Sequence, residues 1–489
     1  MALDPKRAFV VILLIGIFTL AARNIEDPDF WWHLRTGQYI VETHAVPHVD
    51  PFSFTRHGEP WVAHEWLSEI FIYGLYRVAG WGGLITAFAL FTATTFLFLY
   101  LRCSGKPYLA GLIVLWGAFA CRSTWGVRPQ TISVLLASSL LWVLETSGRG
   151  KRRLWAIVPM MLLWANLHAG YELGIALMIC FLIGGWLDNV LGRDIPDRSR
   201  PNLRALALVL MLSLAVVVLN PNGWQLYTYP LATFRSTAMQ SHIAEWFSPD
   251  FHKPEYLPLV GMLLALPVLL SLAPRRISVR SVLLLCASTY AALQSIRLIP
   301  IFVLIAVPEL VAQADAWLEA RRKAPSAIDA RHPRLLRSVS NGALVVAITL
   351  FSGMQVRRVI RYQPQVESRV FPSAAVEFLQ QQPLTGPLFN DYDWGGYLVW
   401  KLYPEQPVFI DGRADLYGNQ LMEQFSNAYN LVGNWSETLD RWNIQTVLIP
   451  PQSALAAALS TNSRWKVVFR GEQAIVLRRI AEPGPRPTS

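Results

Sequence analysis

Two aspartates two positions apart are the first residues in this chain whose spacing suits chemistry. Asp27 and Asp29 flank Pro28, which restricts the backbone, in the stretch DPDFWWHLRTG. A pair of carboxylates on one turn can take a proton from a hydroxyl group or bind a cation. Either aspartate could instead cap the helix expected over FWWHLRTGQYIVE. Because a cap needs only one carboxylate, we interpret the pair as candidate catalytic residues.

Histidines are concentrated in the same region, since five of the nine lie between His33 and His64. A divalent metal site of the Mg or Mn kind, built from the two aspartates with His33, His64 and Glu65, is chemically reasonable. The spacing of these residues is not diagnostic, and carboxylates paired across His33 serve equally well without metal. Arg35, His33, His64 and Glu65 are also candidate substrate contacts.

A second set of polar residues lies in the turns between apolar segments, in CRSTWGVRPQ, NLHAGYELG and SIRLIP. Ionisable groups near bilayer depth are costly, so they usually face a cavity and indicate function. The alternative is that the arginines reach toward lipid headgroups. The candidates in this set are Arg128, His168, Tyr171, Glu172 and Arg297. Glu245, in HIAEWFSPDF, is a separate candidate substrate contact.

Two similar acidic turns occur near the C-terminus, in FNDYDWGGYLVW and FIDGRADLYG. Each follows an expected strand, and ligands tend to bind at strand ends in α/β domains. Ordinary turn chemistry is the alternative, since Asp and Gly are common turn residues. The candidate substrate contacts here are Asp391, Asp393, Trp394, Asp411 and Arg413.

The elements that must position these residues are mainly membrane helices. Of the 489 residues, 53% are hydrophobic and 16% are charged, and the apolar residues lie in blocks. This pattern predicts a polytopic membrane protein of about eleven transmembrane helices. The net charge of +10 does not indicate nucleic-acid binding, because Lys and Arg cluster in short loops between the blocks. The segments begin near Phe9, Trp81, Pro107, Thr131, Leu154, Leu173, Leu203, Tyr256, Ser281, Leu298 and Asn341.

Lys and Arg recur in every second loop, which by the positive-inside rule predicts that those loops are cytoplasmic. The outer side then carries a first loop at 23–80 and a second at 220–255. We expect a transmembrane module over 1–356, a small extracytoplasmic α/β domain over 357–480 and a disordered tail over 481–489. In the α/β domain, PVFID and TVLIP are expected strands, and SAAVEFLQQQ and SALAAALS are expected helices. Trp31 and Trp32 suit a helix lying in the membrane interface.

The first loop, together with GVRPQ, NLHAGYELG, NPNGWQLYTYP and DYDWGGYLVW…DGRADLYG, resembles the GT-C superfamily of membrane glycosyltransferases. The last pair of motifs is also distantly similar to the acceptor-binding region of oligosaccharyltransferase catalytic subunits, although this chain has Asp393-Trp394-Gly395 there.

The resemblance implies a bacterial inner-membrane enzyme that transfers a sugar, with inversion, from a polyprenyl-phosphate donor to a glycan, lipid or protein acceptor. It implies that Asp27 or Asp29 takes the acceptor's proton, and that Arg128, His168 and Arg297 bind the donor phosphate. Two alternatives remain open at this point. One is a transporter or flippase of lipid-linked sugars, and the other is a non-catalytic envelope assembly protein.

Overall fold

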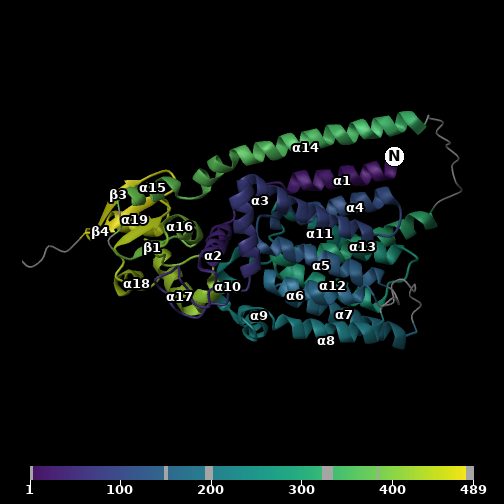
Figure 1. Ribbon diagram of the computed structural model, residues 1–489, viewed down its shortest axis with the longest axis horizontal. Helices are drawn as coiled ribbons and strands as arrows, with labels where there is room; N and C mark the ends of the chain where they lie inside the picture. The colour runs from purple at the N-terminus through teal and green to yellow at the C-terminus, as the bar shows by residue number, and fades with distance from the viewer. Residues whose placement is uncertain are drawn as a thin grey trace, which may run out of the picture. The chain divides into compact units, whose positions relative to one another are not determined.

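The computed structural model describes residues 4–147, 152–192, 202–321, 334–382, 384 and 386–480 (Figure 1). The expected disordered tail at 481–489 lies outside the described residues. Much of three expected cytoplasmic loops, at 148–151, 193–201 and 322–333, lies outside them as well.

The chain forms two compact units. The helical unit consists of Met1–Arg23, Trp81–Gly223 and Ala244–Ile360, and the mixed unit consists of Asn24–Gly80, Trp224–Ile243 and Arg361–Ser489. This grouping by contact places the first loop in the same unit as the C-terminal region. The linear division into a 1–356 module and a 357–480 domain stays a prediction.

The helical unit contains all eleven apolar segments as helices. Proline begins several of them, where its missing N–H is not needed. Among the described residues, five stretches, within α3, α7, α11, α13 and α14, are long and apolar enough to cross a membrane, and four further apolar helices are shorter. The count of eleven spans therefore stays a prediction. The helices are α1 (Pro5–Ala21), α3 (Trp66–Arg102), α4 (Pro107–Ala120), α5 (Pro129–Thr146), α6 (Ile157–Leu167), α7 (Tyr171–Val190), α8 (Leu203–Val217), α11 (Leu257–Leu272), α12 (Val279–Gln294), α13 (Ile299–Ala320) and α14 (Arg334–Val370).

Helix α3 changes direction at Gly80, whose φ of 56° and ψ of −152° are not helical. Glycine adopts this backbone conformation readily because it has no Cβ. The turns of α3 before Gly80 belong to the mixed unit, and Trp81 begins the part in the helical unit. The apolar segment predicted to start near Trp81 therefore begins directly after this change of direction.

The mixed unit is built on a four-stranded sheet with strand order β1-β2-β4-β3. Strands β1 (Leu388–Asn390) and β2 (Thr446–Ile449) are parallel, and β4 (Ile475–Arg479) is antiparallel to both β2 and β3 (Trp465–Arg470). The expected strand at TVLIP and both expected helices are confirmed. The helices of this unit are α2 (Asp29–Thr43), α9 (Gln225–Arg235), α10 (Thr237–His242), α15 (Ser373–Gln381), α16 (Gly395–Leu402), α17 (Ala414–Tyr429), α18 (Trp435–Arg441) and α19 (Ala454–Ser460).

The expected strand at PVFID is wrong, because this segment does not join the sheet. Val408 forms an isolated parallel bridge with Ser53 of the first loop. The side-chain amide of Asn390 takes the place of a neighbouring strand: its Oδ1 accepts from the Phe409 N–H at 2.9 Å and its Nδ2 donates to the Ile410 carbonyl at 2.8 Å. The segment thus joins the first loop to the end of β1.

The predicted role of Trp31 and Trp32 as interfacial anchors is also wrong. Trp31 is fully buried and Trp32 is 7% exposed, on a helix that packs against α16. The Trp31 ring contacts Phe371 and Tyr397 edge-to-face, with centroids 5.3 and 4.8 Å apart. These tryptophans belong to the core of the mixed unit, since burying an aromatic ring contributes more than leaving it at a surface.

Candidate functional site

The carboxylates of the DPD turn are held in different ways at the start of α2. Asp27 Oδ1 accepts a hydrogen bond from the backbone N–H of Asp29 at 3.1 Å, so Asp27 satisfies one of the N–H groups at the helix start. Asp29 Oδ1 accepts from Trp32 Nε1, also at 3.1 Å. The two carboxylates therefore have different hydrogen-bond partners.

Two glycines allow the DPD turn to pack closely on the C-terminal motifs. A Cβ at Gly412 would lie 1.8 Å from Asp29 Oδ1, and a Cβ at Gly396 would lie 2.8 Å from the carbonyl oxygen of Pro28. No side chain fits in either place. The motifs DGR and WGG therefore need glycine where they meet the first loop, and this contact fixes the position of Asp29.

Asp391 and Asp393 lie on the turn after β1, near the same carboxylates. Tyr429 donates a hydrogen bond to Asp391 Oδ2 at 2.6 Å. Asp393 lies at the surface, yet partial burial and then the negative charges of Asp391 and Asp27 raise the pKa of its carboxyl to about 6. Carboxylates from residues 27–29 and 391–393 thus form one electrostatic group, which we call the acidic cluster.

Asp411 and Arg413, predicted as substrate contacts, lie in the interior. Arg413 donates to Asp411 through Nε at 2.8 Å and Nη2 at 2.7 Å, and its Nη1 lies 2.8 Å from Asp50 Oδ1. All three side chains are at most 1% exposed, and the guanidinium stacks over the Trp61 ring at 4.6 Å. Tyr417 donates to Asp411 at 2.8 Å. The geometry favours a buried ion network that joins the first loop to α17.

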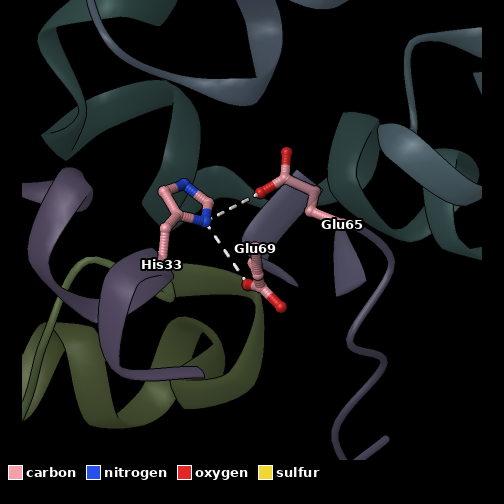
Figure 2. A group of neighbouring side chains, drawn as sticks. All are labelled: His33, Glu65 and Glu69. Carbon is pink, nitrogen blue, oxygen red and sulfur yellow. Dashed lines mark hydrogen bonds and ion pairs between the residues drawn. The ribbon is translucent and has the colours of Figure 1, made fainter. Parts of the chain in front are cut away.

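His33 lies beside two glutamates, Glu65 and Glu69 (Figure 2). Its Nδ1 is 3.3 Å from Glu69 Oε1 and 3.4 Å from Glu65 Oε2. On the other side of Glu65, His64 Nε2 lies 3.5 Å from Oε1. Burial lowers the pKa of His64, but Glu65 and then Asp415 raise it to a net value above the ordinary one.

This arrangement changes the predicted metal ligands. Among the described residues, His33, Glu65 and Glu69 are the side chains close enough to hold one ion, with ligand atoms within 4.8 Å of one another. Asp27 and Asp29, which the sequence grouped with His33, are not in this set, because Asp29 turns toward Trp32. Glu69 was missed, although its i,i+4 spacing from Glu65 would have indicated it.

Two other predicted contacts of the mixed unit have structural partners. Arg35 lies over the Tyr403 ring at 4.8 Å and donates to Gln38 at 2.8 Å. Trp394 is 7% exposed and donates through Nε1 to the Val370 carbonyl at 3.3 Å.

The cationic residues predicted from the turns meet within the helical unit. Arg128 forms an ion pair with Glu245, on the 3-10 turn η4 (Ala244–Trp246). Burial raises the pKa of Glu245, but the charges of Arg128 and then Arg297 outweigh it and hold the pKa below its usual value. Arg297, on the 3-10 turn η6 (Ile296–Leu298), has Nη2 3.3 Å from His168 Nε2. We call these four residues the cationic cluster.

The two ring nitrogens of His168 have different neighbours. The Gly170 N–H donates to Nδ1 at 2.7 Å, and the Ser133 hydroxyl lies 2.9 Å from the same atom. The other nitrogen, Nε2, faces Arg297. The remaining two predictions, Tyr171 and Glu172, lie in the first turn of α7, where Tyr171 is buried.

The fold has known relatives. The oligosaccharyltransferase of Archaeoglobus fulgidus, tethered with an acceptor peptide, matches 92% of this chain and 69% of that chain, with 11% identity and a TM-score of 0.59. The oligosaccharyltransferase AglB of the same organism, in complex with an inhibitory peptide and a dolichol-phosphate, matches 90% and 69%, with 10% identity and a TM-score of 0.53. ArnT from Cupriavidus metallidurans in the apo state matches 97% of each chain, with 15% identity and a TM-score of 0.51.

No family model matches the chain, and no curated protein matches its sequence. The structural likeness confirms the GT-C resemblance at the level of the fold.

Proposed function

We propose that this protein is a membrane glycosyltransferase that moves a sugar from a polyprenyl-phosphate-linked donor to an envelope glycan, lipid or protein acceptor. The observation that carries the proposal is the acidic cluster, in which carboxylates more than 350 positions apart in sequence converge on one turn. The GT-C fold supports it, since AglB of this fold was solved with a dolichol-phosphate. The acidic cluster and the C-terminal region would lie on the outer side of a bacterial inner membrane.

In this proposal Asp27 and Asp29 take the proton of the acceptor hydroxyl as it attacks the anomeric carbon with inversion. A general base must be oriented toward the proton that it removes. The hydrogen bond from Trp32 and the contact with Gly412 orient Asp29. Asp393 is a further candidate base, because a carboxyl with a pKa of about 6 is closer to neutral pH than an ordinary aspartate.

The cationic cluster would bind the donor phosphate. Arg297 Nη2 and His168 Nε2 lie 3.3 Å apart, so one phosphate oxygen could contact both groups. Two guanidinium groups against the single carboxylate of Glu245 leave a net positive charge in this cluster. Positive charge stabilises the phosphate as it leaves the sugar.

A small pocket in the helical unit, with a volume of about 20 Å³, has mostly apolar walls. Its lining residues lie close in sequence to two members of the cationic cluster. Gln130 in its wall is two positions from Arg128, and Pro300 is three positions from Arg297. Lining residues include Thr92, Phe96, Trp125, Gln130, Pro300 and Val303.

The test compares envelope glycolipids and glycans, by mass spectrometry, between a deletion strain and strains that express the wild type or a variant. We expect one sugar to be missing in the deletion strain and in strains with Asp29→Asn or Asp27→Asn. Glu59→Asn, an exposed position of the same loop, is the matched control and should restore the sugar. An unchanged profile in the deletion strain would argue against the enzyme. Normal transfer by both aspartate variants would remove the DPD turn from catalysis.

A further inference from the structure

A buried set of ligand atoms in the mixed unit is not used by the proposed reaction. His33 lies on α2, Glu65 directly precedes α3, and Glu69 lies in the first turn of α3. Their exposed fractions are 4%, 7% and 1%. Figure 2 shows both carboxylates turned toward the same nitrogen of His33. Two buried carboxylates this close repel each other and are costly to remove from water, so this arrangement needs a reason.

Gly37 explains how the two helices bring these groups together. A Cβ at Gly37 would lie 2.1 Å from the carbonyl oxygen of Glu69 and 2.8 Å from the Cβ of Tyr73. The backbones of α2 and α3 are therefore in contact at this glycine. His33 lies one turn earlier on α2, so its ring faces the start of α3.

The distances are longer than those of strong charge-assisted hydrogen bonds. A charge-assisted bond between histidine and a carboxylate is normally about 2.7–2.9 Å long, and one N–H donates well to one acceptor. Here one nitrogen lies 3.3 and 3.4 Å from two carboxylates. The second oxygen of Glu69, Oε2, is buried and has no hydrogen-bond partner among the described residues.

The same distances fit a metal ion. Ligands about 2.0–2.1 Å from the centre of a tetrahedron are about 3.3–3.4 Å apart, which is the separation of His33 Nδ1 from each carboxylate. All three ligand atoms lie within 4.8 Å of one another. We propose that His33, Glu65 and Glu69 bind a first-row divalent transition-metal ion, such as Zn²⁺ or Mn²⁺, that joins α2 to α3.

The donor set decides the class of metal. One imidazole nitrogen with two carboxylates suits a transition metal better than Mg²⁺ or Ca²⁺, which prefer oxygen alone. Three protein ligands leave one position for water, and His64, 3.5 Å from Glu65, orients that carboxylate from outside. The site does not depend on the proposed glycosyl transfer, since it requires neither the aspartates of the DPD turn nor a donor.

The experiment uses the full-length protein in detergent, stripped with a chelator, desalted and loaded with Zn²⁺, Mn²⁺ or Mg²⁺. We expect about one equivalent of Zn²⁺ or Mn²⁺ by elemental mass spectrometry, a higher melting temperature with the metal, and no effect of Mg²⁺. Glu69→Gln and His33→Gln should each weaken binding at least tenfold. Glu59→Gln, an exposed glutamate of the same loop, is the control and should bind as the wild type does.

If a variant fails to fold, the site can still be tested by adding Co²⁺ to the metal-free wild-type protein. Tetrahedral Co²⁺ bound by His33 and the two glutamates should give strong visible absorption, which added Zn²⁺ abolishes. The proposal is overturned if the wild type retains no metal and gives no such absorption. It is also overturned if metal binding by Glu69→Gln and His33→Gln equals that of the control.

Discussion

The buried ion network around Arg413 offers the sharpest test of how the mixed unit is held together. Replacing Arg413 with methionine keeps much of the side-chain volume but leaves Asp50 and Asp411, both fully buried, without their cation. Removing one partner of a buried ion pair typically costs about 3–5 kcal/mol. For a unit of this size that corresponds to a melting temperature roughly 6–20 °C lower. The measurement is thermal unfolding of the purified protein in detergent.

The matched control is Arg441→Met in the same unit. Arg441 pairs with Glu437 at 3.1 Å, but their side chains are 56% and 55% exposed. An exposed pair contributes about 0–1 kcal/mol, so this variant should unfold near the wild-type temperature. Equal melting temperatures for the two variants would refute the structural role of Arg413. A stable Arg413→Met protein that had lost sugar transfer would instead support the substrate contact that the sequence predicted.

The network also predicts how the difference depends on pH. Burial raises the pKa of Asp50, but Arg413 and hydrogen bonds outweigh this effect and lower the pKa below its ordinary value of 3.8. The ion pair therefore contributes fully above the ordinary pKa, and its contribution is lost as the pH falls through the folded value. The stability gap between Arg413→Met and the wild type should narrow in acid, because the abandoned carboxylates can then protonate. A gap that widened in acid would contradict this account.

Two further predictions concern close packing and the acidic cluster. Gly37→Ala places a methyl group against the Glu69 carbonyl and should cost about 1–3 kcal/mol, seen as a lower melting temperature; an unchanged value would contradict the close approach. If Asp393 acts as the base, transfer should increase as the pH rises through about 6, because burial, Asp391 and Asp27 raise its pKa to that value. Asp27→Asn should then shift the pH midpoint of any remaining activity to a lower pH, because it removes a negative charge near Asp393. An unchanged midpoint would show that the charge of Asp27 does not affect Asp393.

Much of the fold follows from local patterns in the sequence. The apolar blocks of the sequence correspond to helices in the structure. The change of direction at Gly80 coincides with the predicted start of a span at Trp81. Arg128, His168 and Arg297 were grouped because each lies in a turn expected on the same side. The structure brings these three together with Glu245, which the sequence did not link to them. This inference rested on the predicted membrane topology, because helices of similar length have their ends at similar depths in the membrane.

What the sequence could not predict depends on contacts between distant segments. Trp31 resembles an interfacial tryptophan by its neighbours, but its ring packs on Phe371 and Tyr397, about 340 and 366 positions later. PVFID has a strand composition, yet the amide of Asn390 occupies the place of its pairing partner. No local sequence pattern predicts such contacts, because they form only when the first loop packs against the C-terminal region.

The pairing of Ser53 with Val408 has a consequence for biosynthesis. The ribosome makes the first loop long before it makes the segment that covers Trp31. The loop therefore cannot complete its packing until most of the membrane helices have been synthesised. Pairings this remote in sequence are slow to form. A chain truncated before Phe371 should therefore leave α2 without its core and open to proteases, whereas the intact chain should protect it.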